Sequence, residues 1–511
     1  MKILFVASEV HPILKVGGIA DVVGSLTKEI KKSGHDVRVA MPFYQPLKDK
    51  KIKPLNKVAS LQIEFNKTSE NINIFETFIP GTEKQTDVPV YLFENNRYLS
   101  NKSVYLDTKS FLYLKRFLFF SQAVLRAFPA LNWKPDIIHC HDWQAGLIPL
   151  LLKIKQKQST IPACPAGRNN QQSTIKTLFT IHNLLIQGRW NYTQVLKCLN
   201  LKGNEIPSLS EKMQGSYGDD FNVLQQAILN SDLINVVSPG YANEIKTDSY
   251  YARGLENVIQ KRKKDLIGIL NGIDTDFFNP ETDQFIKRIY SIKRLDLKNF
   301  NKLDLQKKVN LKQDVEIPLF SMISRLDIQK GIDLVSQAVD EIVKMGGQIV
   351  FLGTGQKEYE TILEKASKKH PGRVAACIKF DQALAQQIYA GADIFLMPSR
   401  FEPCGLSQLI AMRYGTIPVV RSTGGLRDTV ENVKINKKLF GLIKQIQGTG
   451  FVFNDFSLPE FISTIKRTLE FYQNKRNWKQ LQIRVMKQDF SWSKSAQKYL
   501  ELYKKLMDTN N

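Results

Sequence analysis

The sequence predicts an α/β protein built from two doubly wound domains, each with a parallel sheet buried between helices. Continuous runs of Val, Ile and Leu alternate with amphipathic helical segments, a pattern typical of parallel strands that are covered on both faces. These runs fall into two series that divide near residue 265. A chain of 511 residues has room for more than one domain, since a domain takes roughly 100–200 residues.

The first domain is expected over residues 1–262. A glycine-containing turn at 15–18 follows its first apolar run and precedes a helical segment. The buried strands of this domain are expected at 2–7, 37–41, 136–140, 177–181 and 231–237. Ligands of doubly wound sheets bind beyond the carboxyl ends of the strands. Polar residues directly after these runs are therefore the first candidates for a site.

The second domain is expected over residues 263–485, and residues 486–511 are expected to form a helix that crosses back to the first domain. The strands of the second domain are expected at 268–270, 319–323, 348–352, 375–380, 394–397 and 418–420. Two Rossmann-like domains of this kind are expected to face each other across a cleft, where polar ligand sites are common.

Composition excludes a disordered, collagenous or coiled-coil chain, because 43% hydrophobic and 24% charged residues are close to globular averages. The 72 Lys and Arg residues exceed the 49 Asp and Glu residues and leave a net charge of +23. Such an excess suggests a nucleic acid, an anionic membrane or an anionic substrate as a partner. The basic residues are spread over both halves of the chain, however. Solvated lysine-rich faces explain most of them, and no nucleic-acid or membrane partner is expected.

The cysteines and apolar segments predict a cytoplasmic protein without a cofactor. The five cysteines are widely spaced and include no CxxC pair, which fits a reducing compartment better than a disulfide scaffold. No apolar run reaches the about 18 residues of a membrane helix, and Glu9 interrupts the N-terminal run too early for a signal peptide. The HCHDW segment at 139–143 lacks a second Cys/His pair at zinc spacing, so no metal is expected.

Three segments of the first domain place polar groups at strand ends. Lys15, Gly17 and Gly18 suit an anion, because glycines admit close backbone approach and a helix N-terminus favours negative charge. The segment does not match the dinucleotide fingerprint, and a plain tight turn is the alternative. Asp142 and the pair His182–Asn183 each follow an apolar run. They are placed to contact a polar ligand, although a lone His is often structural.

The second domain offers cations, a carboxylate and glycine turns at its strand ends. Arg325 and Lys330 lie five residues apart at a strand-to-helix turn, which suits a diphosphate; solvated surface charge is the alternative. Glu402 precedes Gly405, which opens a helix. A carboxylate in such a turn can bind hydroxyls or stabilise a cation, and neighbouring backbone N–H groups can bind phosphate. The turn at 424–425 is similar.

Together these motifs resemble one enzyme family. In chain order they read KVGGIADVVGSL, IIHCHDWQAGL, FTIHN, ILNGID, SRLDIQKG, FLMPSRFEPCGLSQL and RSTGGLRDTV. They resemble bacterial glycogen synthase and plant starch synthase, the retaining glucosyltransferases of the GT-B fold, and the resemblance covers nearly the whole chain. It implies transfer of glucose from ADP-glucose, or UDP-glucose, to the non-reducing 4-hydroxyl of an α-1,4-glucan. It further implies no metal, and a monomer or small homo-oligomer.

The resemblance also implies roles for individual residues. The implied catalytic residues are Glu402, Arg325, Lys330 and His182. The implied substrate-binding residues are Lys15, Gly17, Gly18, Asp21, Asp142, Asn183, Asn271, Phe380, Cys404, Gly405, Leu406, Ser407, Gly424 and Gly425. Arg325 and Lys330 neutralise the leaving diphosphate in this scheme, and Glu402 with the 404–407 turn holds sugar and phosphate.

Retention of configuration requires either a covalent intermediate or attack on the same face of the sugar. A double displacement needs a well-placed carboxylate. Related GT-B enzymes often have a second Glu eight residues after Glu402, where this chain has Ile410. Same-face attack is therefore favoured, with a phosphate oxygen assisting deprotonation of the acceptor.

This chain departs from the family pattern at four places that bear on nucleotide preference and acceptor contacts. One is Ile186, which stands before Gln187 and Gly188 where the family often has a Tyr. Phe380 stands where the family usually has a Tyr near the base, and Gln226 stands where a Lys is frequent. The insertion at 153–176 is longer than expected. Three alternatives to a glucan synthase remain at this point: a transferase of the same fold that makes a small sugar, a silent carbohydrate-binding protein, and a nucleic-acid binder.

Overall fold

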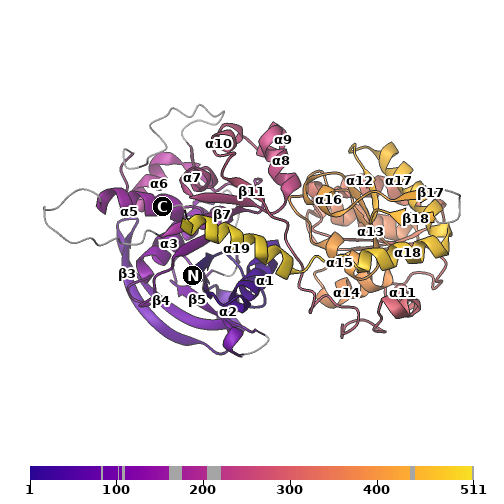
Figure 1. Ribbon diagram of the computed structural model, residues 1–511, viewed down its shortest axis with the longest axis horizontal. Coiled ribbons are helices and arrows are strands. Elements are labelled where there is room, and N and C mark those ends of the chain that lie inside the picture. The colour runs from indigo at the N-terminus through magenta and orange to yellow at the C-terminus, as the bar shows by residue number, and fades with distance from the viewer. Residues whose placement is uncertain are drawn as a thin grey trace. The chain divides into compact units, whose positions relative to one another are not determined.

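The computed structural model describes residues 1–81, 84–101, 103–105, 110–159, 175–203, 206, 220–437 and 444–508. The chain forms two compact units, each with its own sheet (Figure 1). The first unit comprises Met1–Val237, Ala242–Ile269 and Trp492–Asn511, and the second comprises Ser238–Tyr241 and Leu270–Ser491. The predicted domain boundaries at residues 262 and 485 stay predictions. The predicted cleft between the domains also stays a prediction.

The first unit is built on a nine-stranded sheet in the order β11-β10-β7-β6-β1-β2-β5-β4-β3. All neighbours run parallel except β3 with β4 and β4 with β5, which are antiparallel. The strands are β1 (Lys2–Val6), β2 (Asp36–Pro42), β3 (Asn56–Phe65), β4 (Thr68–Ile79), β5 (Val88–Glu94), β6 (Ile137–His141), β7 (Lys176–Ile181), β10 (Leu233–Val236) and β11 (Leu266–Gly268). A separate antiparallel ribbon joins β8 (Arg189–Asn191) and β9 (Asp220–Asn222).

Both faces of the parallel part are buried, as the continuous apolar runs predict. Ile3 and Phe5 of β1 pack into one core with α1 and α19, while Leu4 and Val6 point to the other face and are equally buried. The helices of this unit are α1 (Gly18–Lys32), α2 (Gln45–Asp49), α3 (Phe111–Ala127), α4 (Asp142–Ala145), α5 (Ile148–Ser159), α6 (Tyr192–Leu199), α7 (Val223–Asn230), α8 (Pro239–Thr247), α9 (Ser249–Ala252), α10 (Glu256–Lys261) and α19 (Trp492–Asp508).

Helix α19, the last of the chain, belongs to the first unit and lies beside α1 (Figure 1). Its inner face is apolar and buried through Tyr499, Leu502 and Tyr503. The Tyr503 hydroxyl lies 2.7 Å from Nδ1 of His139 on β6. The final helix therefore contacts the strand that carries the HCHDW motif.

The second unit contains an all-parallel six-stranded sheet in the order β14-β13-β12-β15-β16-β19. Its strands are β12 (Leu319–Ile323), β13 (Gln348–Leu352), β14 (Val374–Cys377), β15 (Ile394–Met397), β16 (Ile417–Arg421) and β19 (Phe451–Phe453). Its helices are α11 (Lys298–Lys308), α12 (Ile332–Lys344), α13 (Lys357–Lys369), α14 (Gln382–Gly391), α15 (Ser407–Arg413), α16 (Gly424–Thr429), α17 (Leu458–Gln473) and α18 (Lys475–Met486). An antiparallel pair, β17 (Lys434–Lys437) and β18 (Lys444–Gln447), lies outside this sheet.

The parallel part of the first sheet and the all-parallel second sheet confirm the predicted α/β class with two Rossmann-like domains. Two strand predictions need correction. The run expected at 268–270 as the first strand of the second series is β11 of the first sheet, because Leu266 and Ile267 pair in parallel with β10. Strand β14 ends at Cys377 and not at residue 380, so Phe380 lies in the following loop.

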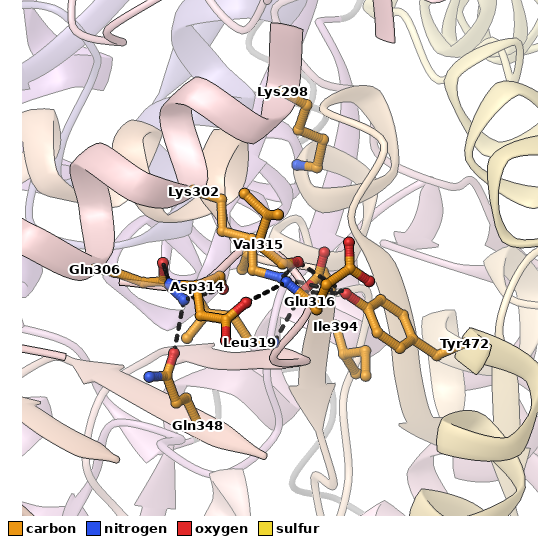
Figure 2. Close-up of polar contacts among 12 residues, drawn as sticks. Lys298, Lys302, Gln306, Asp314, Val315, Glu316, Leu319, Gln348, Ile394 and Tyr472 are labelled. Carbon is orange, nitrogen blue, oxygen red and sulfur yellow. Dashed lines mark hydrogen bonds and ion pairs between the residues drawn. The ribbon is translucent and has the colours of Figure 1, made fainter. Parts of the chain in front are cut away.

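Two lysines of α11 are buried beneath the second sheet. Lys302 Nζ lies 2.7 Å from Asp393 Oδ2, and it also donates to the Val315 carbonyl and the Tyr472 hydroxyl (Figure 2). Lys298 Nζ contacts four oxygens at 2.8–3.1 Å, which are the carbonyls of Tyr389, Ala390 and Tyr414 and the hydroxyl of Thr416. These two cations serve the fold.

Within the part of the chain that the structure describes, no helix is both long and apolar enough to cross a membrane. Most of the insertion expected at 153–176 lies outside the described residues, namely positions 160–174. The stretch before it continues α5.

Candidate functional site

The loop between β1 and α1 brings the first group of predicted residues together. Gly17 is the N-cap of α1 and Gly18 is its first residue. Lys15 Nζ forms an ion pair with Asp21 Oδ1 at 2.8 Å, and both side chains are half-buried. A Cβ built on Gly18 would meet nothing within 4 Å. The loop therefore presents an ammonium and a helix N-terminus beside open space, which is favourable for an anion.

Glu9 holds this loop in place, although the sequence reasoning did not select it. Its Oε2 accepts hydrogen bonds from the backbone N–H groups of Val16 and Gly17, the latter at 2.8 Å. Its Oε1 accepts from the Tyr105 hydroxyl at 2.7 Å. Burial raises the pKa of Glu9, and these hydrogen bonds act against that rise. A carboxylate directly after a buried strand was the signal in the sequence.

The ends of β6 and β7 bring Asp142 and His182 together. Asp142 Oδ1 accepts a hydrogen bond from the His182 backbone N–H at 2.6 Å, and Asp142 has a left-handed backbone with φ of 52°. Burial raises the pKa of Asp142 to about 7, while the backbone N–H groups of His182 and Asn183 lower it. The carboxyl group thus braces the loop that carries both predicted residues.

The His182 ring contacts a second histidine that the sequence reasoning left without a role. His182 Nε2 lies 2.9 Å from Nδ1 of His141, the last residue of β6. Burial lowers the pKa of His182 to about 3, so its imidazole is neutral at physiological pH. A neutral imidazole can donate from one nitrogen and accept at the other, which suits a sugar hydroxyl.

In the second unit, the turns after β12 and β15 bring Lys330 and Glu402 into contact. Lys330 Nζ lies 2.6 Å from Glu402 Oε2, and the Ser399 hydroxyl donates to the same oxygen at 3.0 Å. Glu402 is buried, whereas the Lys330 side chain is 16% exposed. The pair places one cation and one carboxylate at the carboxyl ends of two strands.

Glycine at position 331 permits this approach. Gly331 has a φ of 73°, and a Cβ there would lie only 2.2 Å from the Pro398 carbonyl oxygen. Any larger residue would therefore push the Lys330 turn away from the loop that leads to Glu402. Arg325, at the start of the same turn, is ion-paired with Asp327 at 3.0 Å, and its side chain is 65% exposed.

A tight turn at 404–407 packs against the turn at 424–425. A Cβ on Gly425 would lie 2.2 Å from the Cys404 carbonyl oxygen, and the Gly425 N–H donates to the Glu402 carbonyl at 3.0 Å. Gly405 and Leu406 lead into α15, which begins at Ser407. The structure thus brings the predicted glycine turns beside Glu402.

Cys404 and Asn271 lie in contact. Burial raises the pKa of the Cys404 thiol to about 12, and the Asn271 backbone N–H, which donates to the sulfur, lowers it. Cys404 is therefore an inert thiol at neutral pH. The Asn271 side chain is buried, and its Oδ1 finds no hydrogen-bond partner among the residues described. Such an oxygen is available to a ligand.

Two departures from the family pattern have distinct surroundings. Phe380 is 76% exposed, which is unusual for a phenyl ring and leaves its face free for stacking. Gln226 is buried in α7, where its Oε1 accepts a hydrogen bond from Asn230 at 3.3 Å. Across the described ranges, no group of three or more His, Cys, Asp or Glu side chains is arranged to hold a metal ion.

Family models match both units. The starch synthase catalytic domain model matches residues 2–261. The model for glycosyl transferases group 1 matches residues 304–480. Together they contain every predicted site residue except Asn271.

Curated relatives match the chain from end to end. The glycogen synthase of Thermosipho melanesiensis is 41% identical over 510 residues, which are 99% of this chain and 99% of that protein. The glycogen synthase of Thermotoga maritima is 40% identical with the same coverage. The glycogen synthase of Geobacillus stearothermophilus is 38% identical over 99% of this chain and 98% of its own. These relatives confirm the family resemblance that the motifs indicated.

Two solved structures are similar. The catalytic domain of starch synthase IV from Arabidopsis thaliana, solved with ADP and acarbose, is 33% identical with a TM-score of 0.86 over 99% of both chains. Sucrose-phosphate synthase from Thermosynechococcus elongatus is 17% identical with a TM-score of 0.58 over 99% of both chains. The second likeness concerns the fold alone.

Proposed function

This chain belongs to the glycogen synthase family, and from that premise we propose that it transfers glucose from ADP-glucose to the non-reducing 4-hydroxyl of an α-1,4-glucan, with retention of configuration. It is a glucosyltransferase of glycogen synthesis. The proposal concerns the choice of donor, the acceptor position and the roles of individual residues.

The observation that carries the proposal is the Lys330–Glu402 pair at 2.6 Å beside the exposed Arg325. Breaking the bond between the anomeric carbon and the donor oxygen builds positive charge on the sugar and negative charge on the diphosphate. Lys330 and Arg325 stabilise the diphosphate, and Glu402 faces the cationic sugar. Preorganised charges of this kind typically supply the largest part of a rate enhancement.

Each cation of the site exchanges a protein carboxylate for phosphate when the donor binds. The ion pairs of the protein alone are Lys15 with Asp21, Arg325 with Asp327, and Lys330 with Glu402. The carboxylates hold the cations in place before the donor arrives. The guanidinium of Arg325 suits two phosphate oxygens at once, whereas the lysines act as point charges.

The sugar and acceptor contacts come from neutral groups. The neutral His182 imidazole, the Asn183 amide and the Asn271 oxygen offer hydrogen bonds to hydroxyl groups without adding charge near the cationic sugar. Asp142 positions the His182–Asn183 loop through the backbone N–H of His182. The acceptor is an uncharged polymer and needs no basic surface.

Retention proceeds by attack on the same face of the sugar. Position 410, where a second carboxylate would assist a covalent route, is a buried Ile in α15. Glu402 is therefore proposed to stabilise the cationic sugar by its charge and not to form a bond with it. A phosphate oxygen of the donor instead takes the proton from the acceptor hydroxyl.

ADP-glucose is the proposed donor, and UDP-glucose is the alternative. The plant structural neighbour was solved with ADP. The exposed Phe380 ring gives a nucleobase a face on which to stack, and a purine offers the larger stacking area. The enzyme is proposed to act in the cytoplasm as a monomer or small homo-oligomer, without a metal.

Initial rates with the two radiolabelled donors and glycogen test the proposal, with Lys330→Ala as the inactive reference. We expect label in polymer, a higher kcat/KM for ADP-glucose and no loss of rate in EDTA. A higher kcat/KM for UDP-glucose would overturn the donor assignment. Label in a small sugar with none in polymer would overturn the glucan acceptor.

A further inference from the structure

Histidines gather at the ends of β6 and β7, and only one of them has a role so far. His141 lies between His182 and His139, with ring centroids 5.3 Å and 4.2 Å away respectively. Its Nδ1 lies 2.9 Å from Nε2 of His182. Among the described residues, His141 is the hydrogen-bond partner of the His182 ring.

All three rings are neutral. Burial holds the pKa of His139 and of His141 well below the usual value, and it lowers the pKa of His182 to about 3. Two neighbouring imidazolium ions would also repel each other. In the contact between His141 and His182, one nitrogen therefore carries the proton and donates the hydrogen bond to the other nitrogen.

The far nitrogen of His141 distinguishes the two possible arrangements. His141 Nε2 is buried and has no hydrogen-bond partner within the described part of the chain. If His182 were the donor, neutral His141 would carry its own proton on Nε2 and leave a buried N–H unpaired. Unpaired buried N–H groups are the rarest kind of orphan, and an unpaired acceptor is better tolerated.

We propose that His141 is a positioning residue that donates from Nδ1 to Nε2 of His182, and so fixes His182 as the tautomer that carries its proton on Nδ1. His182 then presents an N–H donor to a substrate oxygen and cannot act as a base through that nitrogen. The inference rests on the proposed function only in giving His182 a substrate contact.

The ring of His141 packs against groups that are themselves held in place. His139 Nε2 lies 2.6 Å from the Thr180 hydroxyl and its Nδ1 lies 2.7 Å from the Tyr503 hydroxyl. Phe5 stacks against His141 with ring centroids 5.5 Å apart and an interplanar angle of 19°. Helix α19 thus buttresses the site through His139, and the His141 ring packs between Phe5 and His139.

Amide substitutions test the donor position. Asn at position 141 places an N–H near the position of Nδ1, whereas Gln places it near Nε2. We expect His141→Asn to keep kcat within about threefold and His141→Gln and His141→Leu to lower kcat by about tenfold, the worth of one hydrogen bond. The KM for donor should change less than kcat. A purely structural role predicts the opposite order, because Gln and Leu match the volume of His better than Asn does.

The tautomer can be observed directly, since the chain has only six histidines. In protein labelled with ¹⁵N-histidine, two-bond correlation spectra distinguish a protonated Nδ1 from a protonated Nε2. Assignment uses His182→Ala, which removes one set of signals. We expect His182 to be protonated on Nδ1 in the wild type and to shift toward Nε2 in His141→Leu. Protonation of His182 on Nε2 in the wild type would overturn the proposal.

The two proposals fail in different ways. Full activity of His182→Ala would remove His182 from the proposed site, while the spectra would still decide which ring donates. Loss of activity in His182→Ala with normal kcat in both His141→Leu and His141→Gln would overturn the positioning role and leave the proposed function standing.

Discussion

Lys298 and Lys330 belong to the same unit, yet their ammonium groups have very different hydrogen-bond partners. The Lys298 ammonium is fully enclosed by four oxygens at 2.8–3.1 Å, three of them backbone carbonyls. Two of these carbonyls, from Tyr389 and Ala390, belong to the last turn of α14, where a cation is favoured by the helix dipole. Lys330 instead has a single carboxylate partner, at 2.6 Å.

The difference separates a structural cation from one that a ligand can take over. A lysine whose N–H groups all point to protein oxygens has none left to donate. A lysine held by one carboxylate can exchange that partner for phosphate, because phosphate offers an equivalent charge. Net charge therefore says little about function: the +23 of the chain counts Lys298 and Lys330 alike.

Replacing Lys330 is the largest test of this comparison. Lys330→Ala removes one cation that stabilises the leaving diphosphate, and kcat should fall by about 10²-fold or more. The midpoint of thermal unfolding should stay within a few degrees. Lys357→Ala, which removes a lysine with a 79% exposed side chain, is the matched control and should leave both quantities unchanged. Normal turnover in Lys330→Ala would remove this residue from the site.

Replacing Lys298 should lower stability and leave kcat nearly unchanged. Lys298→Met keeps the length of the side chain but removes the hydrogen bonds from Nζ to three backbone carbonyls and the Thr416 hydroxyl, which should lower the free energy of unfolding by about 2 kcal/mol. Denaturant unfolding measures this change. The kcat of the folded fraction should stay within about twofold of wild type. A selective loss of kcat without loss of stability would contradict the structural assignment.

The pH dependence of stability sharpens the assignment of Lys298. Burial lowers its pKa to about 7, with Lys302 acting in the same direction and Asp393 against it. Between this value and the usual pKa of 10.5, the unfolded chain binds the extra proton, so raising the pH through this window increases the contribution of Lys298 to stability. The difference in unfolding free energy between wild type and Lys298→Met should therefore grow from pH 6.5 to pH 9.5. A difference that is independent of pH would show that Lys298 keeps its usual pKa.

Glu9 resembles Lys298 in that protein groups supply its hydrogen bonds. It also holds the 15–18 loop, which is proposed to bind the donor. Glu9→Gln keeps the size of the side chain but leaves a single neutral acceptor oxygen, so the two backbone N–H groups of the loop lose their charged acceptor. The KM for donor should rise about tenfold, while kcat changes less. Tyr105→Phe removes a donor from the other oxygen and should have a smaller effect. Equal KM values for Glu9→Gln and wild type would show that the loop does not depend on this carboxylate.

The smallest effect is expected for a conservative change at Phe380, whose ring is exposed whereas the Lys298 side chain is buried. Phe380→Tyr adds the hydroxyl that the family usually has, and it should change the KM for donor by less than about threefold. Phe380→Ala removes the ring and should raise that KM by about tenfold, because one stacked base is worth roughly 1–3 kcal/mol. Donor saturation curves measure both. An unaltered KM in Phe380→Ala would mean that the nucleotide does not stack there.

The sequence predicted most of the strands that are buried on both faces, although it missed β5, and it also missed strands that are not buried in this way. The runs at 319–323, 348–352 and 394–397 coincide with β12, β13 and β15. Strands β3 and β4 were not predicted, because they form an antiparallel edge whose residues alternate between exposed and buried. Such strands lack the continuous apolar run that marks a parallel strand. Strand β19, with three residues, is too short to stand out.

The candidate site was largely predictable because its residues follow strands in recognisable motifs. The structure brings Lys330 to Glu402, and Asp142 to the His182 loop, as strand order requires. Strand order does not indicate a role for Glu9 or for His141. A carboxylate after a strand and a histidine within a metal-like motif each have several common structural explanations, and only their contacts select one.

By itself, the sequence determined the two α/β domains, the family and the positions of the charged and glycine motifs, because hydrophobic periodicity and local turns are properties of neighbouring residues. The tertiary structure alone decided that four protein oxygens surround the Lys298 ammonium whereas Lys330 meets one carboxylate, and which nitrogen of His182 is engaged. These depend on partners distant in sequence: Lys298 lies 118 positions from Thr416, and His141 lies 41 from His182. Burial and distance, which set the strength of a polar contact, exist only once the chain has folded.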